Sequence, residues 1–265
     1  MADYQEGIMY ESFARVYDTF MDNVPYDQWA EDYGRIMKEH GIQDGIVLDL
    51  GCGTGSLTLR LAEKGYDMIG VDYSMDMLEI AREKSEGKDI LYLEQDMREF
   101  ELYGTVGAVL CVCDSINYIL EPEEVEEVFS LVDNYLDPQG LFIFDFNTDY
   151  KYQEIIGERV IAEDRENMSF IWDNYYDEES RINEYALSIF VQEKDDLYRK
   201  YQELHYQRGY SLEEMKEYLE KAGLVFLSAE DGEEGGPVRP DSGRIRVIAR
   251  EQKKWTRLQS EESEE

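Results

Sequence analysis

Short apolar runs alternate with helical patterns over the first 150 residues of the chain. Runs of strand length occupy residues 46–50, 68–72, 90–94, 108–113 and 141–146. The segments with amphipathic helical spacing are residues 56–64, 75–84 and 123–136, with two further helices expected at 12–20 and after Pro25. This alternation predicts an α/β fold with a parallel sheet.

The pattern changes from helical spacing to strict alternation after Asp149. Residues 158–208 contain aromatic-rich stretches such as FIWDNYY and INEYALSIFV, which the turn sequences DEES and EKDD separate. The region is predicted to be a meander of about four antiparallel strands. Ser211 and Glu214 then have the spacing of a capping box, for a helix that Gly223 ends. Two last strands are expected at residues 224–229 and 244–250.

These patterns divide the chain into a core and an insertion. We expect residues 1–150 and 209–251 to form the core, and residues 151–208 to form an inserted antiparallel sheet. The insertion would act as a lid, as a substrate-binding element or as a dimerisation surface. Residues 252–265 are polar and acidic and are expected to be a disordered tail.

The charge of the chain narrows the choice of partners. It has 26 Lys and Arg against 61 Asp and Glu, a net charge of −35, and no dense cationic cluster. Binding to nucleic acid requires a cationic track, so nucleic acid is an unfavoured partner and a neutral or cationic substrate is favoured. The sequence has no apolar run long enough for a membrane span and no secretory signal, which predicts a cytoplasmic protein. Cys52, Cys111 and Cys113 lack the spacing of a metal or redox site, so no metal is expected.

A glycine-rich turn follows the first strand. Residues 49–55 read D-x-G-x-G-x-G, between a strand and a helix. This spacing differs from the G-x-G-x-x-G of dinucleotide loops, and no lysine follows as in a P-loop. Asp49 would repel a pyrophosphate but could accept hydrogen bonds from a cationic amino group. The next two strands also end in acids, Asp72 and Asp96.

The loop and the two acids together resemble the class I S-adenosylmethionine-dependent methyltransferases, in particular small-molecule N-methyltransferases. The resemblance covers about residues 10–150 and the final pair of strands. It implies a Rossmann-like, seven-stranded, mostly parallel sheet, with S-adenosylmethionine as the cofactor. It also implies that Asp72 accepts hydrogen bonds from both ribose hydroxyls, Asp96 from the adenine amino group, and that Asp49 lies near the methionine part. The remaining cofactor contacts that it implies are Tyr17, Gly51, Cys52, Gly53, Tyr73, Met77, Met97 and Cys113.

The acceptor site is expected beyond the carboxyl ends of the strands. Tyr17 and His205 are the candidate catalytic residues, although each could instead be a structural residue, Tyr17 on a buried helix face and His205 in a strand. Asp114 could steer a cationic amine, act as a weak base, or cap a helix. The candidate substrate contacts are Asp114, Asn117, Tyr118 and Asn147.

The sequence therefore predicts in-line methyl transfer to a small-molecule acceptor, most simply an amine. Two alternatives stay open: a methyltransferase that acts on RNA or protein, and a non-catalytic cofactor- or partner-binding protein of the same fold. The inserted sheet has two alternative roles: it covers the site as a lid, or it forms the interface of a homodimer. The acceptor and the methylated atom do not follow from the sequence.

Overall fold

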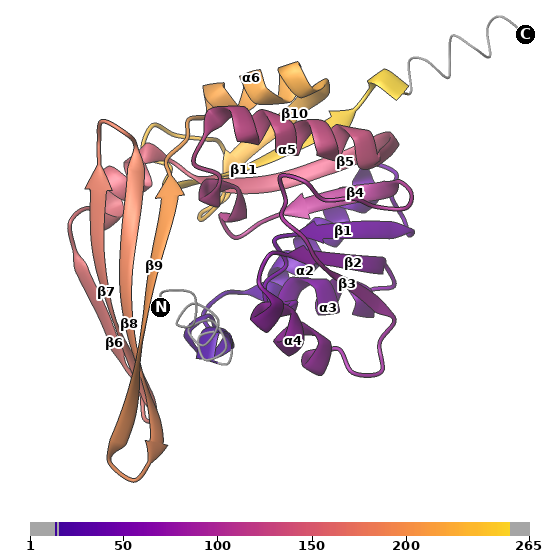
Figure 1. Ribbon diagram of the computed structural model, residues 1–265. Coiled ribbons are helices and arrows are strands. Elements are labelled where there is room, and N and C mark those ends of the chain that lie inside the picture. The colour runs from indigo at the N-terminus through magenta and orange to yellow at the C-terminus, as the bar shows by residue number, and fades with distance from the viewer. Residues whose placement is uncertain (1–13, 15, 255–265) are drawn as a thin grey trace, which may run out of the picture.

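A central sheet of seven strands, in the order β10-β11-β5-β4-β1-β2-β3, organises the core of this computed structural model, which describes residue 14 and residues 16–254 (Figure 1). The pairs among β1 to β5 are parallel, and β11 runs antiparallel to both of its neighbours. The expected seven-stranded, mostly parallel sheet is confirmed. Its strands are β1 (Ile46–Leu50), β2 (Asp67–Asp72), β3 (Ile90–Glu94), β4 (Val106–Cys111), β5 (Leu136–Asn147), β10 (Leu224–Asp231) and β11 (Arg244–Glu251).

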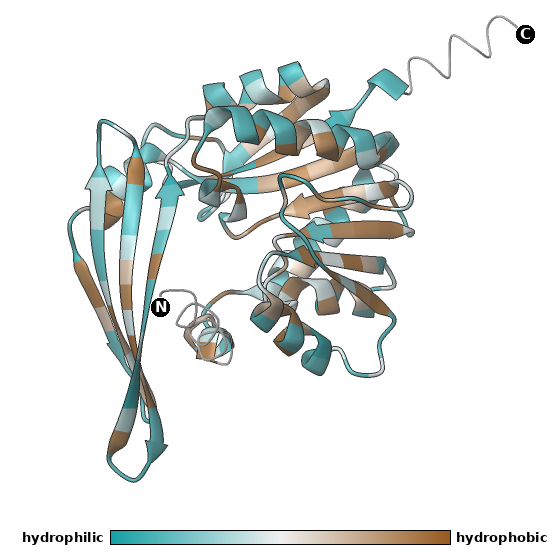
Figure 2. Cartoon of the chain, viewed as in Figure 1, coloured by the Kyte–Doolittle hydropathy of each residue, from teal (hydrophilic) through white to brown (hydrophobic). Residues whose placement is uncertain are grey.

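Helices cover both faces of this sheet. Buried residues of α5 and α6 pack on one face, and those of α2 and α3 pack on the other. Figure 2 shows the result: hydrophobic residues are concentrated in the strands, while the outer sides of the helices are hydrophilic. The helices are α2 (Tyr26–Glu39), α3 (Ser56–Glu63), α4 (Met75–Lys84), α5 (Pro122–Tyr135) and α6 (Leu212–Ala222).

The capping box of α6 forms as its sequence predicts. The Ser211 hydroxyl accepts a hydrogen bond from the Glu214 N–H, and the Glu214 carboxylate accepts one from the Ser211 N–H. Gly223 ends the helix with a φ of 96°, in the left-handed region that glycine adopts without strain.

The insertion is a separate antiparallel sheet of four strands in the order β6-β7-β8-β9. Its strands are β6 (Val160–Asp164), β7 (Met168–Asp177), β8 (Ile182–Lys194) and β9 (Leu197–Arg208), after the short helix η2 (Lys151–Ile156). The predicted meander is confirmed. In Figure 1 it stands beside the core, at the side toward which the parallel strands point.

Several element bounds differ from the predictions, and the differences in β4 and β5 have the clearest physical reason. Strand β4 ends at Cys111 rather than at residue 113, because Cys113 and Asp114 turn the chain with φ values of 62° and 53°. Strand β5 begins at Leu136, directly after α5, where the sequence predicted the end of a helix.

The start of the expected disordered tail is part of the structure. Glu251 is fully buried at the end of β11. The Lys254 ammonium donates to the carbonyl oxygens of Asp133, Asn134 and Leu136, at 2.6, 2.8 and 2.6 Å. These contacts neutralise the carboxyl end of α5, so the expectation of disorder is wrong for residues 252–254. Residues 255–265 lie outside the described residues.

None of the helices in residues 16–254 has the length and apolar character that a membrane crossing requires.

Candidate active site

A cavity of about 730 Å³ lies between the carboxyl ends of the parallel strands and the inner face of the insertion. Its volume is typical of small-molecule sites. One end is formed by the glycine loop and by the residues that follow β2 and β3. The other end is formed by residues 17–26, by the segment after β4, and by strands β7, β8 and β9.

The glycine loop presents bare backbone to the cavity. Gly51 has a φ of +80°, and a Cβ atom there would lie 2.7 Å from the Ser115 hydroxyl oxygen, so only glycine fits. Gly53 has a φ of +53°, and no atom lies within 4 Å of the place that a Cβ would occupy. The Gly53 N–H donates a hydrogen bond of 2.7 Å to Asp72.

Asp49, which is buried, and Asp72, which is half-buried, are the carboxylates beside this loop. Each Asp72 oxygen accepts one backbone N–H, from Gly53 and from Ser74 (2.9 Å), which leaves further lone pairs on both oxygens. Burial raises the pKa of Asp72, although these backbone hydrogen bonds oppose the shift. Asp49 is 2% exposed and accepts a 2.6 Å hydrogen bond from Thr58. Burial raises the pKa of Asp49 to about 6.

Asp96, two residues after the end of β3, lines the cavity together with Arg98. Arg98 Nη2 lies 2.6 Å from Asp96 Oδ2, and Arg98 Nη1 lies 3.0 Å from Glu124 Oε1 on α5. The hydrogen bonds from Arg98 lower the pKa of Asp96. Arg98 thus fixes the direction of the carboxylate, a role that the sequence did not indicate.

The segment after β4 is held by the buried carboxylate of Asp145. Asp145 accepts hydrogen bonds from the N–H groups of Cys113 (3.0 Å) and Asp114 (2.7 Å). These two residues both have left-handed backbone conformations and both line the cavity. Such conformations are strained in non-glycine residues, so they persist where surrounding contacts enforce them.

The Asp114 carboxylate bridges the core and the insertion. It forms an ion pair with Arg244 and accepts a 2.8 Å hydrogen bond from Gln207. Gln207 in turn accepts hydrogen bonds from the hydroxyls of Tyr152 (2.9 Å) and Tyr185 (2.5 Å). No side-chain cap forms at the helix that follows, so the capping interpretation of Asp114 is wrong.

Asn117 and Asn147 lie outside the cavity lining, in contrast to the expectation that they contact substrate. The Asn117 amide donates to the carbonyl oxygens of Asn147 (2.9 Å) and Arg208 (2.7 Å), and its oxygen accepts from the Asn147 N–H (2.8 Å). The Asn147 side chain contacts Tyr152 and Arg244. Both side chains are buried where the insertion joins the core, and hydrogen bonds satisfy both: Asn117 bonds to backbone groups and Asn147 to side chains.

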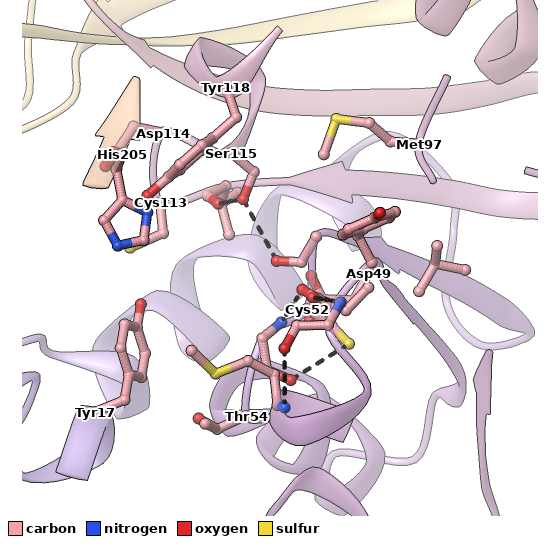
Figure 3. A pocket seen from close by; sticks show the side chains of 18 of the residues that line it. Tyr17, Asp49, Cys52, Thr54, Met97, Cys113, Asp114, Ser115, Tyr118 and His205 are labelled. Carbon is pink, nitrogen blue, oxygen red and sulfur yellow. Dashed lines mark hydrogen bonds between the residues drawn. The ribbon is translucent and has the colours of Figure 1, made fainter. Parts of the chain in front are cut away.

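Aromatic side chains form the wall opposite the glycine loop. The rings of Tyr118 and His205 lie 6.0 Å apart, and those of Trp172 and Tyr185 meet edge to face at 4.6 Å. In Figure 3 the Tyr17, Tyr118 and His205 side chains lie together at one side of the pocket, away from Asp49 and Cys52. Burial raises the pKa of Tyr17 well above its usual range, so its hydroxyl stays protonated.

The helical residues 16–20, which carry Tyr17, are fixed from two sides. On the core side, Asp18 pairs with Lys84 (2.7 Å) and accepts a 2.6 Å hydrogen bond from Thr54 of the glycine loop. On the other side, Arg165 of the insertion pairs with Asp22 (2.7 Å). Tyr17 is therefore held over the loop at the junction of the two ends of the cavity.

The structure brings most of the expected site residues together. Those that line the one cavity are Tyr17, Asp49, Gly51, Cys52, Gly53, Asp72, Tyr73, Met77, Asp96, Met97, Cys113, Asp114, Tyr118 and His205. Sequence reasoning missed Trp172, Tyr185, Leu187 and Gln207, which also line it. The available signal was alternation: Tyr185 pairs with His205 across β8 and β9, on the same face.

Comparisons with known proteins agree with this geometry. A family model described as a methyltransferase domain matches residues 47–140. A Geobacillus sp. (strain WCH70) protein named "Putative methyltransferase" is 37% identical over 221 residues, which covers 82% of this chain and 90% of that protein. A dTDP-3-amino-3,6-dideoxy-alpha-D-glucopyranose N,N-dimethyltransferase of Streptomyces fradiae is 28% identical over 120 residues, 45% of this chain and 46% of the relative.

A solved structure, an S-adenosylmethionine-dependent methyltransferase from Clostridium acetobutylicum ATCC 824, matches with a TM-score of 0.84 and 28% identity, over 92% of this chain and 99% of that chain. The fold and the loop-and-acid site thus define an enzyme that uses a nucleoside cofactor for group transfer. The chain belongs to the class I S-adenosylmethionine-dependent methyltransferase family, and S-adenosylmethionine is its cofactor.

Proposed function

We propose that this enzyme methylates the amino group of a small-molecule acceptor. The observation that carries the proposal is the shared cavity, which joins the glycine loop and its acids to an aromatic wall. Among the described residues that line the cavity, the one cationic side chain is Arg98, which pairs with Asp96 at the cofactor end. The acceptor end therefore suits a neutral or cationic molecule better than a phosphate or a carboxylate.

The residues at the cofactor end fit S-adenosylmethionine, which when bound supplies an activated methyl group. The bare backbone at Gly51 and Gly53 allows close approach of the methionine and ribose parts. The unused lone pairs of Asp72 suit two vicinal hydroxyls, and the Asp96 carboxylate suits the adenine amino group. Asp49 offers a buried anion to the amino group of the methionine part. The remaining proposed contacts are Tyr17, Cys52, Tyr73, Met77, Met97 and Cys113.

The acceptor end orients the nucleophile and excludes water. The aromatic faces of Tyr118 and Trp172 favour a cationic group, and the protonated hydroxyl of Tyr17 can donate a hydrogen bond. His205 is the candidate proton acceptor. Asp114 remains a cavity-lining anion, but Arg244 balances its charge. The hydrogen-bond network that runs from Arg244 through Asp114 and Gln207 to Tyr185 thus fixes the shape of the aromatic wall. Tyr17 and His205 contact the acceptor.

Methyl-transfer assays with a panel of amines test this function. We expect transfer to amino sugars and to arylalkylamines, and at least a tenfold lower kcat/KM for glycine, whose carboxylate would find no cation. Calorimetric titration with S-adenosylmethionine comes first and shows that the cofactor end is intact. Binding of the cofactor without transfer to any amine would contradict the proposal.

Cofactor affinity should fall as the pH drops through about 6, the folded-state pKa of Asp49. Protonation below that pH removes the anion that would face the methionine amino group. The raised pKa also means that the cofactor-free protein is more stable with Asp49 protonated. This contribution, roughly 3 kcal/mol, is fully present below about pH 4, falls as the pH rises from about 4 to 6, and is absent above that. Calorimetry at several pH values between 5 and 8 measures the first effect, and thermal unfolding between about pH 3.5 and 7 measures the second. Asp49→Asn should remove both pH dependences; their persistence in that variant would assign them to another group.

A further inference from the structure

A buried carboxylate lies behind His205 on strand β9. Glu203 is 5% exposed, and its Oε2 lies 2.8 Å from Nε2 of His205. The other oxygen, Oε1, has no hydrogen-bond partner among the described residues. Burial of a carboxylate with an unpartnered oxygen destabilises a fold, so stability does not explain a glutamate at this position.

Alternation along β9 places Glu203 and His205 on the same face, and His205 reaches the cavity. An ionised carboxylate accepts hydrogen bonds but cannot donate them. A neutral His205 therefore carries its proton on Nε2, toward Glu203, and its lone pair on Nδ1. The pair has the chemistry of a carboxylate–imidazole unit, in which the carboxylate sets the tautomer and stabilises the imidazolium.

The other described groups around His205 are either neutral or have their charge balanced by a partner, in contrast to Glu203. Tyr185 is its cross-strand partner on β8, Tyr118 contacts it from the helix after β4, and Tyr17 lines the same cavity. Burial raises the pKa of both Tyr17 and Tyr185, so both hydroxyls remain neutral. Asp114 also lines the cavity, with its charge balanced by Arg244. Glu203 is thus a charged group in direct contact with the imidazole, 2.8 Å from its Nε2.

We propose that Glu203 positions His205 as the proton acceptor for an ammonium group of the acceptor; the inference rests on the proposed function. An aliphatic amine enters at neutral pH as an ammonium, without a lone pair. One N–H bond breaks and the proton moves to Nδ1 of His205. The freed pair forms the N–C bond to the methyl group while the C–S bond breaks, and that electron pair stays on sulfur. Glu203 stabilises the imidazolium until the proton passes to water.

Imidazole NMR tests the pair without any turnover. The chain has two histidines, His40 and His205, so the signals are assigned with one His205→Ala variant. We expect neutral His205 to be protonated on Nε2 in the native protein. In Glu203→Gln we expect the Nδ1–H tautomer to appear beside the Nε2–H tautomer, because an amide can donate a hydrogen bond to Nε2 as well as accept one from it. The same tautomer population in both proteins would overturn the inference.

Kinetics with an ammonium acceptor test the role. Glu203→Gln should lower kcat/KM at least tenfold, without a change in cofactor affinity or a lower Tm. The double variant with His205→Ala should be no slower than His205→Ala alone, since both act through one group. The matched control is Glu184→Gln, on the outer face of β8 opposite Tyr206, which should behave as the native enzyme.

Additive losses would show that Glu203 is structural and overturn the inference. Glu203→Asp keeps the charge but shortens its reach, and it replaces Glu203→Gln if that variant does not fold. It should lose activity while neutral His205 keeps its proton on Nε2. A native enzyme that methylates no amine would refute the proposed function, whereas the NMR experiment would still decide whether Glu203 controls His205.

Discussion

Asp72→Ala should weaken the binding of S-adenosylmethionine about a hundredfold, which corresponds to roughly 2–3 kcal/mol. The alanine removes the carboxylate that we expect to face the ribose hydroxyls. It also removes the acceptor of the Gly53 and Ser74 N–H groups, so the glycine loop loses an anchor in the same step. Calorimetric titration of the variant with the cofactor measures the loss directly.

The control for this experiment lies on the same strand. Asp67→Ala removes a carboxylate from the opposite, exposed end of β2 and should leave the dissociation constant unchanged. Asp72→Asn keeps one acceptor oxygen, so its dissociation constant for the cofactor should lie between those of Asp67→Ala and Asp72→Ala. Native affinity in Asp72→Ala would mean that the cofactor does not contact the end of β2.

Asp145→Asn should destabilise the protein by roughly 3 kcal/mol, or about 6–12 °C in Tm. The native carboxylate accepts the N–H groups of Cys113 and Asp114 with its two oxygens, and an amide has one acceptor oxygen. One buried N–H then faces an NH₂ group, and the strained turn loses part of its support. The variant also removes a buried negative charge near Arg244, whose Nη1 lies 4.0 Å from Asp145.

Thermal and urea unfolding measure this destabilisation, with the exposed Asp89→Asn as the control for loss of one surface charge. Because Cys113 and Asp114 line the cavity, kcat/KM for the acceptor should fall more than cofactor affinity. An unchanged Tm would show that the turn is stable without the carboxylate.

The sequence by itself determined the layout of the core. Strand and helix periods, the capping box at Ser211 and the glycine spacing depend on residues that are close in sequence, so they can be recognised without knowledge of the fold. The same holds for the acids that end β2 and β3. Once parallel strands are predicted, their carboxyl ends must meet at one edge, and this places Asp72 and Asp96 beside the loop.

The tertiary structure decided which polar residues contact the cavity. Asp114 and Arg244 are 130 residues apart in sequence, Asp114 and Gln207 are 93 apart, and Asn117 and Arg208 are 91 apart. Asn117 resembled a substrate contact because its position after β4 is local information. Its hydrogen bonds to the backbone, where the insertion joins the core, depend on distant parts of the chain and cannot be recognised locally. The partners of a buried polar group come from wherever the chain folds back, so its role follows from the packing of the insertion against the core.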